Sequence, residues 1–263
     1  MTSRDGRATD LDKGTADVAA LSPLLWDRLA ESTLAMAAPS CGERVLDACC
    51  GLGASALPAA RLVGPTGQLD AVDTSSAMVS GLRERLTDLP WAEAFHADVT
   101  TWPGRGYDLV QCVMGIFFLR PMQPRARLLA QLSHDRGRAV FTVWREGAME
   151  APARALTAAV AAARGTRPPA GPGAHPLAAL DTQRRFGNWL AELGTGSVRV
   201  REQHLSITLD EHVAWLLVTG SSFVEMLRGL SDAQVAEVRD RYLARLLPEG
   251  EVDASHLVGL LSR

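Results

Sequence analysis

The sequence predicts an α/β protein whose sheet is mostly parallel and carries helices on both faces. One observation is that short apolar segments alternate with helical segments of 10 to 15 residues before residue 145, a pattern typical of parallel strands joined by crossover helices. A second is the length of 263 residues with 47% apolar residues, which permits one large domain with a sizeable core.

The N-terminal region predicts a tail followed by a helix. Residues 1–16 are polar and mixed in charge, so we expect a flexible tail there. Apolar residues then recur at three- and four-residue steps, which predicts one helix over residues 17–38. The residues that set this spacing are Leu21, Leu24, Leu25, Leu29 and Met36, and Pro39 is expected to end the helix.

The central region predicts five strands and three helices in alternation. The expected strands are residues 43–49, 67–73, 91–99, 107–115 and 137–144, and the expected helices are residues 53–64, 75–89 and 121–135. Gly64 is expected to end the first of these helices, and Ser75 or Ser76 to cap the second.

The second half of the chain predicts a lid over the sheet. We expect a helix over residues 148–163, a Pro- and Gly-rich loop over 165–176, a helix over 177–194, a strand over 197–209, helical segments over 210–229 and 232–247, and a final strand over 254–263. We interpret residues 17–263 as a single domain in which helix 17–38, the loop and the inserted helices 209–247 form the lid.

Composition excludes several classes of protein. The net charge of −3 and the pI near 6.1 provide no basic field for a nucleic-acid backbone. No apolar run reaches about 18 residues and the N-terminus lacks a signal-peptide pattern, so we expect a cytoplasmic protein without a membrane span. The four cysteines lack zinc spacing, so no metal site is expected, and Lys13, the only lysine, lies in the polar tail, which excludes lysine-based catalysis.

Residues 47–53 form an acid-to-glycine turn between a predicted strand and a predicted helix. Parallel sheets bind ligands at this end of their strands, and Gly51 and Gly53 let the backbone approach a ligand closely. Asp73 ends the next strand, 20 residues after Gly53, where a carboxylate can accept both hydroxyls of a ribose. Asp98 lies at the end of the third strand, where it can accept the amine of an adenine. The sequence therefore predicts a nucleoside held along one sheet edge.

Two cofactors contain a nucleoside that fits this row. The segment "GLGASA" matches a dinucleotide fingerprint with Ala56 in the third small position. However, Asp47 lies four residues before Gly51, and a carboxylate so close would repel a pyrophosphate. S-adenosylmethionine carries an ammonium and a sulfonium, which an acid attracts. This favours S-adenosylmethionine and leaves an NAD(P)-dependent oxidoreductase as the less favoured alternative.

Four segments in order, "VLDACCGLGAS", "LDAVDTSSAMV", "FHADV" and "YDLVQCVMGIFFL", resemble the motifs of the class I S-adenosylmethionine-dependent methyltransferases over residues 43–145. The nearest resemblance is to the small-molecule, natural-product and quinone-methyltransferase branch. It implies a Rossmann-like fold with sheet order 3-2-1-4-5-7-6, in which the seventh strand is antiparallel. Here that strand would be residues 254–263.

The resemblance also implies which residues bind the cofactor. Around the methionine moiety these are Asp47, Ala48, Cys49 and Gly51, with Cys112 and Val113 facing its amino end or the methyl group. Around the ribose and adenine they are Asp73, Thr74, Met78, Asp98 and Val99. The sequence departs from the family pattern at Cys49, which holds the position of the first glycine, and a small thiol is expected to fit there.

The resemblance implies methyl transfer to an oxygen, nitrogen or carbon atom. The Phe-, Trp- and Leu-rich capping segments and the absence of a basic patch favour a small, largely apolar acceptor. Phe117, Trp144 and Phe223 are the candidate acceptor-binding residues. No catalytic residue can be named from the sequence, and His175 in the Pro- and Gly-rich loop is the best candidate base. A methyltransferase-fold enzyme that catalyses another reaction, such as a cyclisation, is the alternative, and a homodimer is left open.

Structural interpretations stay open for several of these residues. Asp47 and Asp73 could each cap the helix that follows, and a purely structural role is open for Asp98. The cysteines could behave as small buried apolar residues rather than reactive thiols. Phe117 is as well explained by core packing, and simple lid packing is favoured for Trp26, Trp215 and Phe223.

Overall fold

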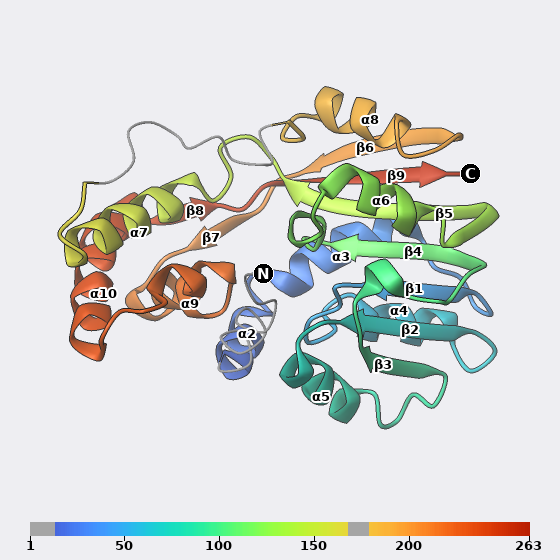
Figure 1. The fold of residues 1–263 in the computed structure, drawn as a ribbon, viewed down its shortest axis with the longest axis horizontal. Coiled ribbons are helices and arrows are strands. Elements are labelled where there is room, and N and C mark those ends of the chain that lie inside the picture. The colour runs from blue at the N-terminus through green and yellow to red at the C-terminus, as the bar shows by residue number, and fades with distance from the viewer. Residues whose placement is uncertain (1–13, 168–178) are drawn as a thin grey trace.

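A computed structural model describes residues 14–167 and 179–263 of the chain, and its main layer is a seven-stranded sheet (Figure 1). The strands are β1 (Arg44–Ala48), β2 (Gln68–Asp73), β3 (Ala92–His96), β4 (Tyr107–Val113), β5 (Ser133–Trp144), β6 (Ser197–Gln203) and β9 (His256–Ser262). Their order is β3-β2-β1-β4-β5-β9-β6, and β9 runs antiparallel to both of its neighbours. The predicted sheet order is confirmed, with β9 as the seventh strand.

Helices cover both faces of this sheet. On one face lie α3 (Trp26–Ala37), α4 (Ala56–Val63) and α5 (Ser76–Arg85), and on the other lie α6 (Met122–Ala130) and α8 (Gln183–Ala191). Alternate residues along each strand point to opposite faces, so one strand serves two cores. In β1, for example, Val45 packs in the core beneath α3 and α4, whereas Leu46 packs in the core beneath α6 and α8.

The prediction of one N-terminal helix over residues 17–38 is wrong in detail. The structure has two helices, α2 (Thr15–Leu21) and α3, separated by residues 22–25. The break lies at Pro23, which has no N–H to donate and so cannot continue a helix from its interior. The leucine spacing persists across the break because Leu21, Leu25 and Leu29 are all fully buried in the same core.

The prediction of one strand over residues 197–209 is also wrong in detail. The chain leaves the main sheet after Gln203, and residues 206–208 form β7 (Ser206–Thr208). This short strand pairs antiparallel with β8 (Glu251–Asp253) as a separate two-stranded ribbon. The helix expected over 177–194 is shorter than predicted, since Thr182 caps α8 through its side chain.

Helices and the β7–β8 ribbon form a cap beside the carboxyl ends of the parallel strands (Figure 1). Its elements are α2, α7 (Glu150–Ala163), α9 (Glu211–Thr219), the 3₁₀ helix η3 (Ser222–Leu227), α10 (Asp232–Leu246), β7 and β8. A third core holds these elements together, and the fully buried side chains of Leu156, Leu217, Val238 and Tyr242 lie in it. The region expected as 210–229 is therefore α9 plus η3, and α7 belongs with the cap.

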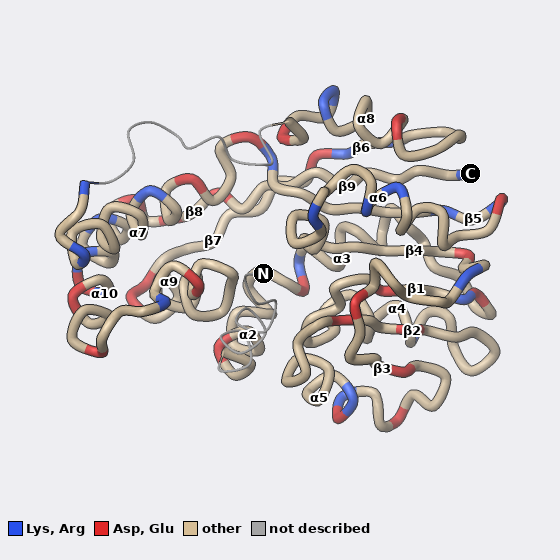
Figure 2. The backbone as a smooth tube through the Cα atoms, viewed as in Figure 1, with Lys and Arg blue, Asp and Glu red and all other residues tan. Residues whose placement is uncertain are grey.

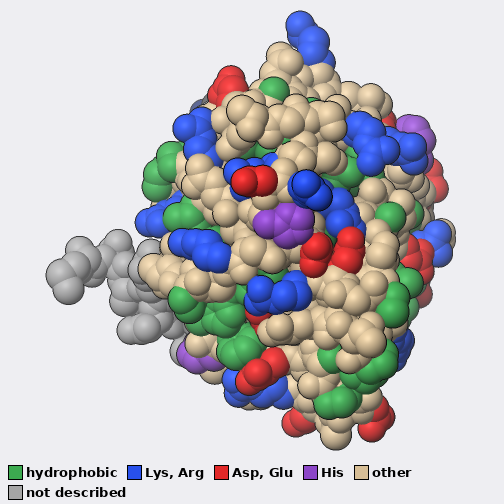
Figure 3. Space-filling view, turned by 90° about the vertical axis from the view of Figure 1, so that its right-hand side faces the viewer, with side chains coloured by type: hydrophobic (Ala, Val, Ile, Leu, Met, Phe, Trp, Pro, Cys, Tyr) green, Lys and Arg blue, Asp and Glu red, His purple; other side chains and the backbone are tan. Residues whose placement is uncertain are grey.

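Charged residues of both signs are scattered along the chain rather than gathered on one element (Figure 2). On the face at the amino ends of the parallel strands, acidic and basic side chains lie side by side among apolar ones (Figure 3). Among residues 14–167 and 179–263, no helix combines the length and the apolarity that crossing a bilayer requires.

We expect Gly259→Ala to destabilise the fold because β9 passes directly beneath α8. An added Cβ would lie 2.4 Å from Leu190 and 2.6 Å from Phe186, both buried. Overpacking of this kind costs about 1–3 kcal/mol, which urea unfolding would measure.

The matched control is Gly187→Ala on α8, where an added Cβ meets only Val200 at 3.7 Å. Alanine is favoured over glycine in a helix by up to about 1 kcal/mol, so this variant should be stabilised. Equal stability of the two variants would contradict the close packing of α8 on β9.

Candidate functional site

The sheet order brings the predicted cofactor-binding residues into one row at the carboxyl edge. The neighbours β3, β2, β1 and β4 end beside one another, with Ala48 opposite Val72 and Asp73 opposite His96 in the parallel registers. Asp98 follows β3, Asp73 ends β2, the turn 49–53 follows β1, and Val113 ends β4. Segments that lie far apart in the sequence thus form a continuous edge.

The turn after β1 has an unusual backbone. Cys49, Gly51 and Gly53 all have positive φ values, of 60°, 52° and 83°. The N–H groups of Cys49 and Cys50 both donate to the Val72 carbonyl, at 2.9 and 3.2 Å, which ties the turn to β2. At Gly51 an added Cβ would meet nothing within 4 Å, so this glycine leaves open space above the backbone. The turn therefore has the close-approach surface that the sequence predicts.

Asp73 holds this turn against the next strand–helix corner. One carboxylate oxygen accepts the Gly51 N–H at 2.9 Å, and the other accepts the Ser75 N–H at 2.9 Å. Burial raises the pKa of Asp73, while the N–H groups of Ser75, Gly51 and Thr74 oppose that effect. A carboxylate offers about four acceptor positions, so two backbone bonds leave capacity for ribose hydroxyls.

Asp47 lies at the end of β1 and is 1% exposed. Its Oδ2 accepts the Ser55 hydroxyl at 2.7 Å, just before α4 begins, and its Oδ1 has no hydrogen-bond partner among the described residues. Burial raises the pKa of Asp47 to about 7, with the Ser55 hydroxyl and the Gln111 amide opposing the rise. A nearby cation would restore the charged form.

Gln111 is a residue of this site that our sequence prediction missed. It is 0% exposed, and it stands directly opposite Asp47 in the parallel register of β1 and β4. Neither its amide nitrogen nor its amide oxygen has a partner among the described residues. An unpaired buried polar group costs about 1–3 kcal/mol. The available signal was a glutamine within the apolar segment "DLVQCV".

The residues predicted to bind the adenine are more fully engaged in contacts within the protein than Gly51 and Asp73 are. Asp98 caps the 3₁₀ helix η1 (Val99–Thr101), because its Oδ1 accepts the N–H of Thr100 at 2.9 Å and the hydroxyl at 2.7 Å. Asp98 thus has a structural role as a helix cap, and we had left a structural role open for it. Val99 is buried in the core beneath α6.

The two other predicted residues on this side lie at the start of α5. Met78 is buried in its first turn, and Thr74 is exposed just before it.

Two thiols meet beneath the end of β4. An added Cβ on Gly115 would lie 2.5 Å from the Cys49 Cβ and 2.9 Å from the Cys112 Sγ, so both side chains pack on this glycine. The two thiols are free cysteines, as are Cys41 and Cys50. The Cys112 thiol and burial raise the pKa of Cys49, and burial raises the pKa of Cys50. Neutral thiols are poor nucleophiles, which agrees with a packing role.

The predicted acceptor residues lie where the sheet meets the cap. Phe117, in the 3₁₀ helix η2 (Ile116–Phe118), and Trp144, at the end of β5, each pack against both the sheet core and the cap core. Phe223 in η3 packs against the cap core alone. His175 lies outside the described residues. Among the described residues, no group of three or more His, Cys, Asp or Glu side chains could hold a metal ion.

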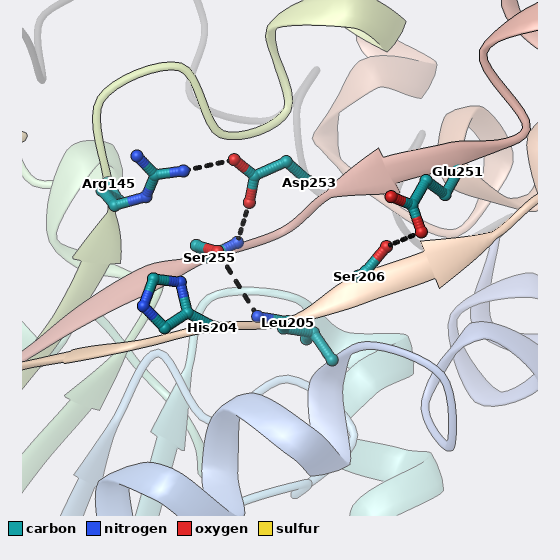
Figure 4. A pocket seen from close by; sticks show the side chains of 7 residues that line it. All are labelled: Arg145, His204, Leu205, Ser206, Glu251, Asp253 and Ser255. Atoms are coloured by element: carbon teal, nitrogen blue, oxygen red, sulfur yellow. Dashed lines mark hydrogen bonds and ion pairs between the residues drawn. The ribbon is translucent and has the colours of Figure 1, made fainter.

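A separate polar hollow lies at the joint between the sheet and the β7–β8 ribbon (Figure 4). Its volume is about 410 Å³, and its lining is Arg145, His204, Leu205, Ser206, Glu251, Asp253 and Ser255. Arg145 pairs with Glu202 of β6 at 3.2 Å and with Asp253 of β8. The arginine thus joins the sheet to the cap, and none of the residues that line the hollow is a predicted cofactor-binding residue.

Comparison with known proteins agrees with this architecture. Residues 45–134 match the family model described as "Methyltransferase domain". The matched segment contains the turn, Asp73, Asp98 and the end of β4, and the sheet has the order expected of the class. Residues 45–134 of this chain thus resemble a methyltransferase domain, within a Rossmann-like fold whose sheet has the order of class I methyltransferases.

Curated relatives match this methyltransferase domain over part of their length. The chain is 32% identical to the aklanonic acid methyltransferase DauC of Streptomyces sp. strain C5, over 41% of this chain and 52% of that protein. It is 33% identical to the ubiquinone/menaquinone biosynthesis C-methyltransferase UbiE of Pseudomonas putida, over 40% of this chain and 46% of that protein. The chain therefore spans about half the length of these two curated relatives.

Solved structures extend the likeness to the whole fold. A putative methyltransferase from Bacillus halodurans matches with a TM-score of 0.57 at 14% identity, over 89% of this chain and 97% of that one. The [4+2]-cyclase SpnF matches with a TM-score of 0.56 at 13% identity, over 90% of this chain and 81% of that one. At these identities the likeness shows the fold alone.

The backbone conformation of the turn leads to a stability prediction for substitutions of Cys49. Its φ of 60° is a conformation that glycine adopts freely and that a β-branched residue strongly disfavours. We expect Cys49→Val to lower the free energy of unfolding by about 2 kcal/mol and Cys49→Gly to change it by less than about 1 kcal/mol.

Urea unfolding would measure both, with Cys50→Val as the control. Cys50 is adjacent and 6% exposed, but its φ lies outside the positive range. Equal losses for the two valine variants would mean that burial, rather than backbone conformation, sets the cost.

Proposed function

We propose that this chain transfers a methyl group from S-adenosylmethionine to a small, largely apolar acceptor. The observation that carries the proposal is the row formed by the turn, Asp73 and the start of α5, in which the Gly51 N–H and both Asp73 oxygens are fixed at one edge. The proposal is also supported by the printed names of the two curated relatives, one an aklanonic acid methyltransferase and the other a quinone-pathway C-methyltransferase.

The residues present fit the cofactor by charge and by space. Asp73 retains acceptor capacity for ribose hydroxyls, and Gly51 leaves open space where the methionine portion would pass. Asp47 and Gln111 contribute buried polar atoms without partners beneath the same turn. We assign Ala48, Cys49, Cys112 and Val113 to the methionine end, and Thr74, Met78, Asp98 and Val99 to the nucleoside.

The chemistry then depends mainly on alignment. When bound, S-adenosylmethionine supplies a methyl group on a positively charged sulfur that is already a good leaving group. Holding the acceptor in line can contribute about 7–11 kcal/mol, whereas a general base contributes about 10²–10⁴-fold. We therefore assign the main catalytic contribution to residues that position the two reactants, and we name no general base.

The acceptor class follows from the joint between the sheet and the cap. Phe117 and Trp144 pack against both cores, and Trp26, Trp215 and Phe223 are partly buried against the cap core. Aromatic side chains at this joint favour an aromatic, polyketide or quinone acceptor, which would pack against them. The homodimer and the cytoplasmic location remain predictions from the sequence.

Two other functions are distinguished by product mass and by thermal shift with each cofactor. Incubation with S-adenosylmethionine and a panel of phenols, quinones and aromatic polyketides should give a product heavier by one methylene group, together with S-adenosylhomocysteine. A product of unchanged mass would favour a cyclisation or another rearrangement, and stabilisation by NADH instead of S-adenosylmethionine would favour an oxidoreductase.

We expect Gly51→Ala to weaken cofactor binding far more than it weakens the fold. An added Cβ meets no protein atom within 4 Å, so the change costs only the strain of φ 52°, about 1–2 kcal/mol. In the complex the same Cβ would contact the methionine portion. Calorimetry with S-adenosylhomocysteine should show a loss of about tenfold or more, about 1.4 kcal/mol.

Gly106→Ala is the matched control, since Gly106 also has a positive φ, 74°, and open space around its Cβ position. It lies before β4, at the opposite edge of the sheet. This variant should lose similar stability and bind S-adenosylhomocysteine unchanged. Loss of binding in both variants would mean that strain alone is responsible.

For the acceptor, we expect Phe117→Ala to raise the KM of the acceptor by about tenfold while leaving S-adenosylhomocysteine affinity unchanged, since burial of an aromatic ring contributes about 1.5–3 kcal/mol. Phe118→Ala is the control, because Phe118 is adjacent and 42% exposed. Equal KM values for the two variants would remove Phe117 from the acceptor site.

A further inference from the structure

Gln111 is a buried polar residue that has no role in the methyl-transfer step proposed above. It lies on β4, opposite Asp47 on β1, and neither residue is more than 1% exposed. Three of their polar atoms lack partners among the described residues: the Asp47 Oδ1 and both amide atoms of Gln111. Buried polar groups almost always have hydrogen-bond partners. Three unpartnered atoms on two facing residues therefore indicate that Asp47 and Gln111 act together.

A general need for polarity on this face does not explain Gln111. The same face carries another buried polar pair, Thr142 of β5 and Thr33 of α3, whose hydroxyls lie 2.6 Å apart. The Thr33 hydroxyl also donates to the Leu29 carbonyl at 2.7 Å, so that pair is satisfied. Gln111 has no comparable bond, and the charged group closest to it in register is the Asp47 carboxylate.

We propose that Gln111 is a positioning residue that holds the Asp47 carboxylate in its charged form beneath the turn, so that the site accepts a cationic ligand at neutral pH. The proposal rests on the proposed function, because the cation is the cofactor. In this role the amide N–H donates toward the Asp47 Oδ1, as the Ser55 hydroxyl already does toward the Oδ2.

The groups that act on Asp47 come from each element around it. Ser55 before α4 and Gln111 of β4 favour the carboxylate, while Asp73 of β2 opposes it. The Cys50 thiol in the turn is the other titratable neighbour. Burial outweighs these effects and brings the pKa of Asp47 to about 7.

The sign of the pH dependence follows from this balance. A bound cation favours the carboxylate, so the pKa of Asp47 is lower in the complex than the value of about 7 in the free protein. Affinity is therefore fully present above about pH 7 and declines as the pH falls through that value. Removing the amide of Gln111 withdraws a stabilising group and should move this acid limb to higher pH.

The test is calorimetric affinity for S-adenosylmethionine between about pH 5.5 and pH 8.5. We expect Gln111→Met, which retains the length and loses the amide, to move the acid limb upward by about one pH unit. Affinity at pH 7 should then fall about tenfold and recover at the highest pH. Gln111→Asn, which shortens the side chain by one methylene, should move the limb in the same direction if the methionine variant does not fold.

Thr142→Val is the matched control, since it removes a buried hydroxyl from the same face and leaves Gln111 and Asp47 in place. Its acid limb should coincide with that of the unaltered protein, and titration of the ligand itself is common to all variants. An unmoved limb in Gln111→Met, or an equal loss of affinity at every pH, would overturn the role of Gln111.

A second readout separates this proposal from the proposed function. The pKa of the Asp47 carboxyl can be followed by ¹³C NMR in the free protein, without cofactor. If the unaltered protein binds no S-adenosylmethionine, the proposed function fails, yet a higher Asp47 pKa in Gln111→Met would still support the role of Gln111. Binding together with an unchanged Asp47 pKa would retain the function and reject the positioning role.

Discussion

The Asp73 carboxylate is the junction on which the candidate site depends. Its two oxygens accept N–H groups from different corners of the fold, Gly51 in the turn after β1 and Ser75 at the cap of α5. The turn has three residues with positive φ and is otherwise tied to β2 through the Val72 carbonyl. One side chain therefore fixes both the surface proposed for the methionine portion and the place proposed for the ribose.

The cap depends on a second set of constraints. The chain passes between the main sheet and the β7–β8 side of the cap after β5, between β6 and β7, and between β8 and β9. Arg145 stands at the first of these and pairs with Glu202 and Asp253, while the Ala254 N–H donates to the Leu205 carbonyl at 2.8 Å. Polar contacts thus hold together the segments that connect the sheet with the cap. The apolar side chains of Phe117 and Trp144 pack against both the sheet core and the cap core.

Sequence periodicity predicted the elements well where local and tertiary preferences agree. The first four strands of the central region and the caps at Ser75 and Gly64 fall close to where alternation and capping chemistry place them. The helix expected over 121–135 is wrong at its end, because α6 ends at Ala130 and β5 begins at Ser133. Sequence periodicity failed where the chain divides into two elements while the spacing of apolar residues continues unchanged. The leucine spacing continues through the break at Pro23, and alternation continues from β6 into β7 although the two strands belong to different sheets.

The candidate site was predictable to the extent that strand order is. Once the four motifs predict the order β3-β2-β1-β4, the residues at the strand ends must form one row. Gln111 could not be assigned this way, because its importance lies in a cross-strand partner and in the absence of other hydrogen bonds, neither of which the sequence displays. Likewise, the packing of Cys49 and Cys112 on Gly115 depends on how the turn folds back over β4.

Burial of Asp47 bears on which class of ligand this edge can hold. The Asp47 carboxylate is 1% exposed and loses most of its hydration. The hydrogen bond from the Ser55 hydroxyl does not fully offset this loss, since the pKa of Asp47 remains at about 7. A pyrophosphate above the turn would add repulsion and drive Asp47 to its neutral form, whereas an ammonium and a sulfonium would offset the lost hydration. A cationic ligand would therefore favour the charged form of Asp47, which burial disfavours in the free protein. A buried charge that lowers the stability of the free protein and favours ligand binding is typical of binding sites.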